Sequence, residues 1–305
     1  MTTVAYLGPE GTFTHAAALA WPGTTPVALP TVQDVYRAVQ DGSVDRGVVA
    51  IENTVEGYVV PSLDALLASD DVVGIDEAVL EIAFDAFVRP GAGELTEVSA
   101  HPHGLAQCQR FVARTGLAPV PAASNAAACR DATPHQVALG PRLCGELYGL
   151  ETYERDVQDF AGARTQFLLL ARRDDAREAL DAARDAGDAR WRTMLAVTPV
   201  VAGPGVLARI LAAFGAGWLN LSSLITRPLK VAGRYVFVLT VDAAPVDPAL
   251  RAVLQGLLDE GHLLKTLAAF PERADRAVVL DLDHVPSGSV DGTAAPADLG
   301  RELLW

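Results

Sequence analysis

The stretch GARTQFLLLARR, Gly162–Arg173, joins a run of apolar residues to a polar segment that leads into it. The run that begins at Phe167 has the length and composition of a buried strand. On a regular strand Arg164 and Gln166 face one side of the sheet and Thr165 faces the other. A hydroxyl, a guanidinium and an amide at a strand end suit a ligand site, but taken alone they are better explained as a polar strand entrance. The rest of the chain has to decide between the two interpretations.

Bulk composition limits the class of protein. The chain has 305 residues, enough for two domains, and a formal net charge of −14. Nucleic acids need a concentrated basic face, so we expect no nucleic-acid partner. We see neither a signal peptide nor an apolar run of membrane-spanning length, so we expect no membrane partner. Cys108, Cys129 and Cys144 form no paired motif, which predicts a reducing, cytoplasmic setting.

Residues 1–170 alternate short apolar runs with helical patterns, which is typical of α/β layers with a largely parallel sheet. The predicted strands are Val4–Leu7, Gly47–Ile51, Ile82–Val88, Val98–His101, Val137–Leu139 and Phe167–Leu170. The predicted helices are Thr14–Ala20, Val32–Asp41, Ser62–Ala68, Gly104–Thr115, Asn125–Asp131 and Arg142–Tyr148. Ligands of such folds bind at the carboxyl ends of strands, so polar segments that follow strands are candidate sites.

The chain changes character after this first part. Residues 172–190 are charged and Ala-rich, and we interpret residues 176–191 as a partly helical linker. Residues 192–272 follow the order βαββαβ of a small ferredoxin-like sandwich. Its predicted elements are strand Met194–Val201, helix Gly205–Phe214, strands Leu219–Arg227 and Tyr235–Val241, helix Pro248–Glu260 and strand Leu264–Phe270. Residues 273–305 are rich in Gly, Ser, Pro and Asp and predict an extended tail.

Two loops after predicted strands carry candidate ligand groups. Gly8–Thr12 joins the first strand to a helix, where glycine lets the backbone approach an anion, although an ordinary βα turn explains the spacing better. IENTVEG, residues 51–57, follows a buried strand. Asn53 could hydrogen-bond a ligand there, and Glu52 or Glu56 could transfer protons. A solvated turn is an equally good interpretation of this second loop.

Another polar cluster, AHPH at residues 100–103, ends a predicted strand, and Gln107 follows on the next helix. His101 and His103 are separated by a proline and have no third ligand nearby, so we predict no metal site. Ser124 and Asn125 precede an Ala-rich helix and suit an N-cap, a position that can also hold a carboxylate.

Taken together, these segments resemble one family. The motifs TVAYLGPEGTFTHAAA, GVVAIENTVEG, SAHPHGLAQC, ALGPRLCGELYGL and RTQFLLL occur in the order seen in prephenate dehydratases. The second unit, with PGVLARIL and LNLSSLITRP, resembles their regulatory ACT domain, and the resemblance covers residues 3–271. Several short motifs in the correct order are far more specific than any one of them.

The resemblance implies a fold and an activity. The fold is α/β: a two-lobed, periplasmic-binding-protein-like catalytic domain over residues 1–175, followed by a ferredoxin-like βαββαβ ACT domain. The reaction is the conversion of prephenate, or a related cyclohexadienyl acid, to phenylpyruvate, water and CO2 in phenylalanine biosynthesis. The resemblance implies no metal or organic cofactor. It implies a phenylalanine effector and assembly into a homodimer or homotetramer.

Site residues follow from the resemblance position by position. The threonine of the family's Thr-Arg-Phe motif helps the hydroxyl leave and maps to Thr165. The implied catalytic set is Thr165, Asn53, Glu52 and Gln107. The implied substrate-binding set is Thr12, Ser124, Asn125, Arg164, Gln166 and Phe167. The implied allosteric set is Gly205, Val206, Leu207, Asn220, Thr226 and Arg227.

The chain departs from the family pattern at several positions. Gln166 stands where the family has arginine, Ala163 where it has asparagine, Ala100 where it has serine, and Ile225 where the ACT motif has glutamate. Replacing an arginine that grips a carboxylate should cost about 1.5–3 kcal/mol of binding. A non-aromatising prephenate decarboxylase or other cyclohexadienyl lyase of secondary metabolism therefore stays open, as does a catalytically inactive small-molecule sensor. The retained Thr165 favours the dehydratase.

Overall fold

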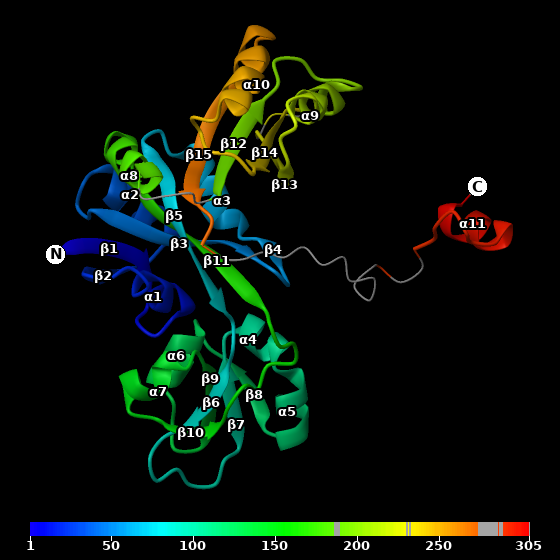
Figure 1. Ribbon diagram of the computed structural model, residues 1–305. Helices are drawn as coiled ribbons and strands as arrows, with labels where there is room; N and C mark the ends of the chain where they lie inside the picture. Colours follow the sequence, from blue (N-terminus) through cyan, green and yellow to red (C-terminus); the bar gives the residue numbers. More distant parts are fainter. Residues whose placement is uncertain (186–189, 230, 232, 274–285, 287–288, 305) are drawn as a thin grey trace. The chain divides into compact units, whose positions relative to one another are not determined.

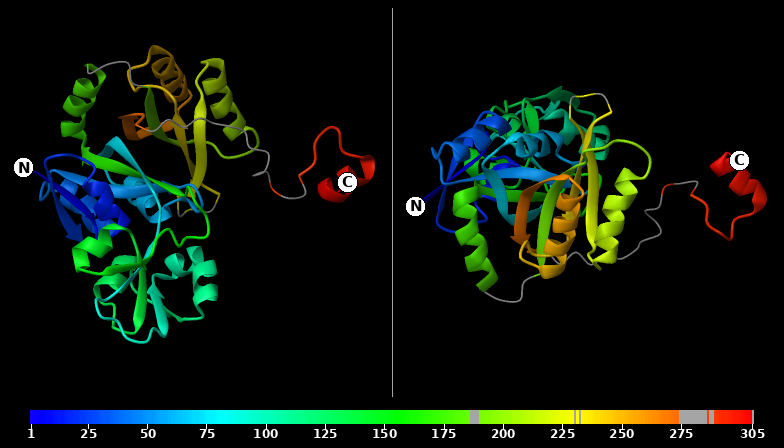
Figure 2. Two further views of the ribbon diagram at one scale, coloured as in Figure 1. Left: turned by 60° about the horizontal axis from the view of Figure 1, so that its bottom comes forward. Right: turned by 90° about the horizontal axis from the view of Figure 1, so that it is seen from above.

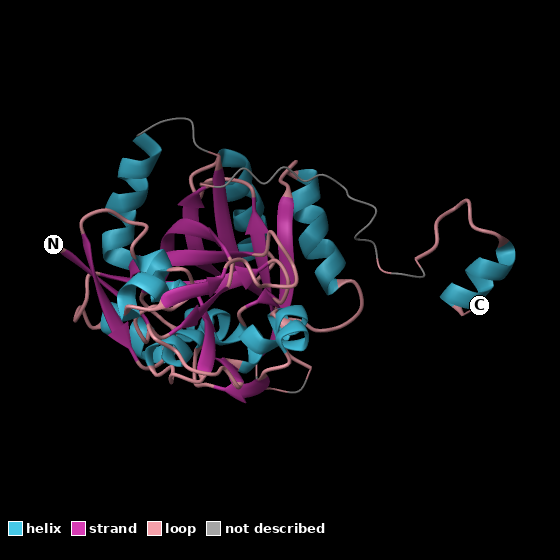
Figure 3. Cartoon of the chain, turned by 90° about the horizontal axis from the view of Figure 1, so that it is seen from below, coloured by secondary structure: helices cyan, strands magenta, loops and turns pink. Residues whose placement is uncertain are grey.

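The computed structural model describes residues 1–185, 190–229, 231, 233–273, 286 and 289–304 (Figure 1). The chain divides into a large unit, Met1–Arg273, and a short unit, Ala274–Trp305. The predicted tail was expected to be extended, but within the short unit Pro296–Leu303 forms helix α11. The rest of this section concerns the large unit, whose strands are surrounded by helices (Figure 3).

A ten-stranded sheet runs through the large unit. Its strands are β1 Thr2–Leu7, β2 Thr24–Leu29, β3 Arg46–Asn53, β4 Gly57–Tyr58, β5 Val72–Glu81, β11 Arg164–Arg172, β12 Trp191–Thr198, β13 Leu221–Pro228, β14 Tyr235–Val241 and β15 Leu263–Pro271. Their order is β13-β14-β12-β15-β5-β11-β3-β1-β2, and β4 pairs with β3 at the side. The prediction of a largely parallel sheet holds for β1, β2 and β3, but β11 runs antiparallel to both its neighbours.

A second, five-stranded sheet forms the core of a separate lobe. Its strands are β6 Asp85–Val88, β7 Glu97–Ala100, β8 Ala118–Pro121, β9 Gln136–Gly140 and β10 Glu151–Glu154, in the order β10-β6-β9-β7-β8. The chain enters this lobe after β5 and returns through β11, and Figure 1 shows both strands extending between the large sheet and this lobe. Residues 82–163 therefore make one lobe, and the part of the large sheet from β5 to β2 makes the other. The two-lobed α/β architecture is confirmed.

Helices cover both sheets. They are α1 Phe13–Ala18, α2 Val32–Gln40, α3 Val60–Ala68, α4 Pro102–Gln107, α5 Gln109–Thr115, α6 Asn125–Arg130, α7 Leu143–Tyr148, α8 Arg173–Asp185, α9 Val206–Ala216 and α10 Pro248–Asp259. The single helix predicted over residues 104–115 is two helices, because the chain breaks at Cys108, where the backbone is not helical.

Strand β5 was missed by the sequence analysis because acidic residues interrupt its apolar run. Asp76 and Glu77 are both buried in the structure. Asp76 accepts hydrogen bonds from the Trp21 indole and the Arg273 guanidinium, and Glu77 accepts one from the Gln166 amide. Buried carboxylates are tolerated when their hydrogen-bonding capacity is satisfied, and here their partners come from distant parts of the chain.

The predicted linker is in fact largely the helix α8. Asp174 and Asp175 lie in its first turn, where acidic side chains favour a helix start. Ala176, the next residue, is buried at 3% exposure on the side that meets the sheet. Residues 186–189 of the predicted linker lie outside the described residues.

The C-terminal part of the large unit, β12 to β15 (hereafter the βαββαβ unit), has the predicted order of elements. Alternate residues of its strands enter two different cores. Leu195 and Val197 of β12 pack with α9 and α10, whereas Met194 and Ala196 share a core with Leu63 of α3. The two parts predicted as separate domains therefore bury apolar surface together.

The sheet is also continuous between the two parts. Ala268 of β15 pairs with Gly74 of β5 in parallel. A Cβ at Gly74 would lie 2.7 Å from the Ala268 Cβ, so only glycine allows this close approach of the strands. Figure 2 shows the strands of the βαββαβ unit, coloured from green through yellow to orange, beside the strands of the catalytic lobes.

Candidate active site

Two adjoining cavities lie between the lobes. One has a volume of about 570 Å³ and the other about 560 Å³. They share four lining residues, Phe13, Thr14, His101 and Asn125, so they are parts of one cleft. The predicted residues that line it are Thr12, Asn53, Gln107, Ser124, Asn125, Thr165 and Phe167. Seven predicted site residues that are far apart in sequence thus meet in one place.

Thr165 and Asn53 form the polar centre of the larger cavity. They are direct partners in the antiparallel pairing of β11 with β3. The Asn53 Nδ2 donates a hydrogen bond of 2.8 Å to the Thr165 Oγ1. Thr165 is buried, at 7% exposure. The fold therefore holds a hydroxyl at the wall of the cleft by a contact that only pairing of these two strands could create.

The orientation of the Asn53 amide is fixed by its other end. Its Oδ1 accepts hydrogen bonds from the backbone N–H groups of Val55, at 2.8 Å, and Glu56, at 3.1 Å. The nitrogen must therefore face Thr165, because an oxygen cannot donate. Since the Thr165 oxygen accepts from Asn53, its own proton is left to be donated elsewhere.

Glu56 links the two lobes across the cleft. Its Oε1 accepts a hydrogen bond of 3.1 Å from the Gln107 Nε2, and its Oε2 lies 3.6 Å from the His103 Nδ1. Glu56 comes from the turn after β3, and its two partners come from α4. The sequence analysis named Glu56 as an acid of this loop but placed Glu52 in the catalytic set.

The structure corrects the placement of three predicted site residues. Gln166 is buried on the opposite face of β11, where its Nε2 donates 2.6 Å to the Glu77 Oε2. Glu52 pairs with Gln166 in register and does not line the cleft. Arg164 is exposed at the strand start and does not line it either. Strand alternation is the reason: Thr165 and Phe167 face the cleft, and their neighbours face away.

This placement changes the meaning of Gln166. Its carboxamide is engaged with a buried carboxylate of β5, so it does not reach a substrate in the cleft. The expected loss of substrate binding through the missing arginine therefore has no structural basis in this chain, and a Gln166→Arg exchange would act on the Glu77 contact instead.

In the smaller cavity, Thr12 and Ser124 cap helices. The Thr12 Oγ1 accepts from the His15 N–H at the start of α1, and the Ser124 Oγ accepts from the Ala127 N–H at the start of α6. The Thr12 hydroxyl also donates to the Leu7 carbonyl at 3.3 Å, whereas the Ser124 hydroxyl donates to no other described residue. Both capping residues line the cleft, so the cap predicted at Ser124 is compatible with ligand binding there.

His101 contributes little positive charge here. Burial is the main cause that lowers the pKa of His101, followed by the nearby His103, while Glu56 acts in the opposite direction. The His101 Nδ1 accepts from the His103 backbone N–H at 3.2 Å, which also requires an unprotonated nitrogen. Arg130 is the one arginine or lysine among the described residues that line the cleft. Within that part of the chain, no three His, Cys, Asp or Glu side chains gather as metal ligands would.

Gly104 fixes the position of Asn125. The Asn125 Oδ1 accepts the His101 N–H at 2.9 Å, and a Cβ at Gly104 would overlap this carboxamide. Replacing Gly104 with alanine should therefore displace Asn125 and raise KM about tenfold, the effect of losing one hydrogen bond, with a smaller change in kcat. Steady-state kinetics with prephenate, the substrate that the family resemblance implies, would measure this.

Gly256→Ala is the matched control, because Gly256 is also helical and a Cβ there would meet nothing within 4 Å. That variant should keep the wild-type KM and be at least as stable as the wild type. An unchanged KM in Gly104→Ala would show that Asn125 is not held for ligand binding.

The predicted allosteric residues are not brought together. Val206 and Leu207 line a cavity of about 230 Å³ beside Arg234, Tyr235 and Phe237, and Gly205 directly precedes them with φ +81°. The other three lie elsewhere. The Asn220 Nδ2 donates to Asp242, Thr226 is exposed on β13, and Arg227 binds Asp64.

Side chains of β13 and β15 add polar contacts between the βαββαβ unit and the catalytic lobes. Arg227 makes two hydrogen bonds of 2.8 Å to the Asp64 carboxylate of α3. Lys265 donates to three carbonyls at the end of α3. The Tyr58 hydroxyl, from a residue that lines the cleft, lies 2.5 Å from the Ser223 Oγ of β13. Ser223 in turn donates to the Thr240 Oγ1 at 3.0 Å.

The chain is similar to known prephenate dehydratases over most of its length. The family model described as "Prephenate dehydratase" matches residues 4–175. A prephenate dehydratase of Mycolicibacterium smegmatis is 34% identical over 95% of this chain and 99% of its own length. One of Corynebacterium glutamicum is 34% identical over 83% of each chain.

Solved structures of prephenate dehydratases are also similar to this chain. Prephenate dehydratase from Arthrobacter aurescens, in complex with L-Phe, matches with a TM-score of 0.76 and 30% identity over 88% of this chain and 90% of that one. The enzyme from Staphylococcus aureus matches with a TM-score of 0.73 and 25% identity over 88% and 99%.

Within the described residues, no helix has both the length and the apolar character needed to cross a membrane.

Proposed function

Since this chain belongs to the prephenate dehydratase family, and converts prephenate to phenylpyruvate, water and CO2, we propose that Thr165 is the group that helps the ring hydroxyl leave. The single observation that carries the proposal is the hydrogen bond from the Asn53 Nδ2 to the Thr165 Oγ1. Because the Thr165 oxygen accepts this hydrogen bond, the Thr165 hydroxyl proton can be donated to a substrate.

The chemistry needs such a donor. When the bond from the ring to its carboxylate breaks, CO2 departs and the electron pair of that bond enters the ring. The carbon–oxygen bond at the opposite ring carbon then breaks, and the hydroxyl leaves with the electrons of that bond. Negative charge develops on the departing oxygen. A hydrogen bond aimed at that oxygen stabilises the charge more in the transition state than in the bound substrate. Thr165 gives this bond, and a proton from solvent completes the water.

Neutral groups, together with Arg130, would orient the two carboxylates of the substrate. The Ser124 hydroxyl, which donates to no other described residue, lines the smaller cavity, and Asn125 borders both cavities. Glu56 contacts Gln107 and His103 of the other lobe and so bridges the cleft at that point. An acid at that point also repels a carboxylate, so we propose that substrate carboxylates lie toward Ser124 and Arg130, away from Glu56.

Product identification tests this reaction against its alternatives. Purified protein incubated with prephenate at neutral pH should form phenylpyruvate well above the spontaneous rate, as seen by ultraviolet absorbance and mass spectrometry. A dihydroaromatic keto acid would instead mark a non-aromatising decarboxylase. No product would favour the inactive sensor, an alternative that the intact Asn53–Thr165 pair argues against.

For regulation, we propose that phenylalanine binds the cavity lined by Val206, Leu207, Tyr235 and Phe237. The cavity is apolar and small, as the side chain of this amino acid requires, and Arg234 at its edge suits a carboxylate. A homodimer or homotetramer remains a prediction from the family resemblance, and a cytoplasmic location remains a prediction from the cysteine pattern.

The contact between Tyr58 and Ser223 is the proposed route from this unit to the cleft. Ser223→Ala removes this contact of the Tyr58 hydroxyl and changes no residue that lines the cleft. We expect basal activity within about twofold and a concentration of phenylalanine for half-maximal inhibition at least about fivefold higher, the lower end of typical coupling energies.

Ser222→Ala is the control for this experiment. Ser222 neighbours Ser223 on β13, and its hydroxyl donates only a 3.4 Å bond to a backbone carbonyl of its own unit. Inhibition curves that coincide for the two variants would rule out the proposed route.

A further inference from the structure

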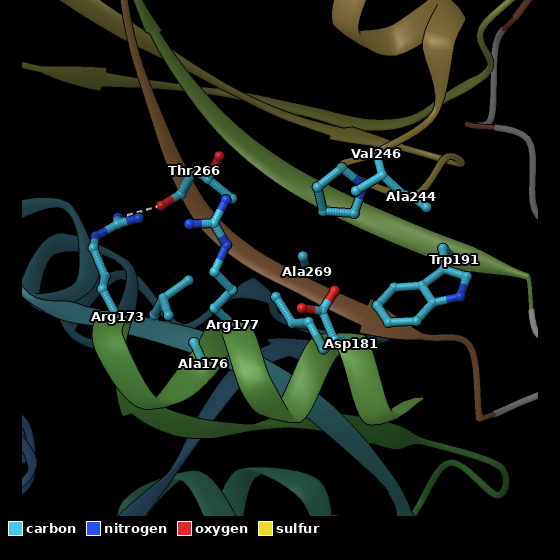
Figure 4. A pocket seen from close by; sticks show the side chains of 12 residues that line it. Arg173, Ala176, Arg177, Asp181, Trp191, Ala244, Val246, Thr266 and Ala269 are labelled. Carbon is cyan, nitrogen blue, oxygen red and sulfur yellow. Dashed lines mark hydrogen bonds between the residues drawn. The ribbon is translucent and has the colours of Figure 1, made fainter. Parts of the chain in front are cut away.

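Another cavity lies outside both the cleft and the proposed phenylalanine cavity. It has a volume of about 370 Å³ and lies between α8, strands β5, β12 and β15, and the loop after β14 (Figure 4). Among the described lining residues, it shares none with the other cavities. Its volume falls within the range of small-molecule sites.

Most of the cavity wall is apolar. Val73, Ala176 and Ala269 are buried and form its floor. In Figure 4, the Trp191 indole lies at one end of the cavity, near Ala244. Aromatic side chains favour planar apolar ligands, which they contact through their faces and edges.

The opposite end of the cavity is cationic. Arg177 extends from α8 toward Thr266 in Figure 4. Arg173, one turn earlier on α8, donates a hydrogen bond of 2.5 Å to the Thr266 carbonyl and is held there. The Arg177 guanidinium, by contrast, makes no hydrogen bond or ion pair to another described residue. A guanidinium with its donors available at the end of an apolar cavity suits a carboxylate, which it can bind through two parallel hydrogen bonds.

We propose that this cavity binds a small aromatic monocarboxylate, with the carboxylate on Arg177 and the ring against Trp191. The chain has a net charge of −14, so an anion needs such a local cation to bind. Asp181, one turn beyond Arg177 on α8, also lines the cavity. Its negative charge should weaken the binding of a carboxylate. Removing that charge should therefore tighten binding, whereas removing the charge of Arg177 should weaken it.

The position of the cavity gives this ligand a structural effect. It would contact the connecting helix α8, strand β5 of the catalytic lobe and strand β15 of the βαββαβ unit at once. Val73 of β5 lines the cavity, and Leu80 at the other end of the same strand pairs with Thr165. The ligand would therefore stabilise the junction between the two parts of the molecule.

The test uses the full chain labelled with ¹⁵N, in which the four tryptophans give separate indole signals. Trp191→Phe identifies the Trp191 signal. Titration with 3-phenylpropionate should shift that signal saturably, and 3-phenylpropan-1-ol, of the same shape without the charge, should not. Arg177→Gln should weaken binding about tenfold, and Asp181→Asn should tighten it about two- to fivefold.

Arg251→Gln is the matched control, because Arg251 is an exposed arginine of α10 that does not line the cavity. It should bind 3-phenylpropionate as the wild type does. The proposal is overturned if the Trp191 signal does not move at millimolar ligand, if the alcohol binds as well as the acid, or if Arg177→Gln and Arg251→Gln behave alike. Because the readout is binding, it does not depend on the assignment of Thr165.

Discussion

Replacing Thr165 with valine should lower kcat for phenylpyruvate formation by about a hundred- to a thousandfold and leave KM for prephenate nearly unchanged. Valine has the same shape as threonine and fits the buried position, so the fold should be retained. What is lost is the one proton that the Asn53 contact leaves available. A donor that acts on the departing oxygen is worth this much because the charge it stabilises exists only in the transition state.

Thr165→Ser is the companion variant, because it keeps the hydroxyl and loses only a methyl group. It should retain activity within about tenfold, and both variants should unfold near the wild-type temperature. A valine variant with nearly normal kcat would disprove the role of Thr165. Equal losses in the serine and valine variants would show that the methyl group, and hence packing, is what matters.

Asn53→Asp should have the second-largest effect, a fall in kcat of about a hundredfold. The aspartate keeps the oxygen that accepts the Val55 and Glu56 N–H groups, so the loop after β3 should hold its shape. Its second oxygen replaces the nitrogen that donates to Thr165. A carboxylate can only accept, so it would draw the Thr165 proton toward itself and away from the substrate. Rapid-quench or steady-state kinetics would measure the loss.

Asn125→Asp separates this effect from the simple addition of negative charge. It places a carboxylate in the same cleft but does not contact Thr165, and its Oδ1 position can still accept the His101 N–H. It should raise KM, through repulsion of the substrate carboxylates, and change kcat much less. If both aspartate variants lose kcat equally, the orientation of Thr165 by Asn53 is not the cause.

Local patterns were enough to predict most of the elements that form the catalytic lobes. The strand at residues 4–7, the helix at 32–41 and the order βαββαβ of the second unit appear in the structure within a few residues of the predicted bounds. Each of these depends on the periodicity of apolar residues along one segment, which neighbouring residues set by themselves. The motif around Thr165 and that around Asn53 were likewise visible as short segments.

The sequence by itself therefore determined the α/β layers and the βαββαβ unit, and its family resemblance added the two lobes and the residues Thr165, Asn53 and Gln107 as candidates for the site. Only the tertiary structure decided which of the neighbouring polar groups face the cleft: it turns Gln166 and Glu52 away and brings Glu56 across to Gln107. It also decided that β5, with its two carboxylates, is a buried strand that joins the sheet of the βαββαβ unit to that of the catalytic lobes. The physical reason is that strand register and the partners of buried charges depend on residues far away in sequence, which no local pattern contains.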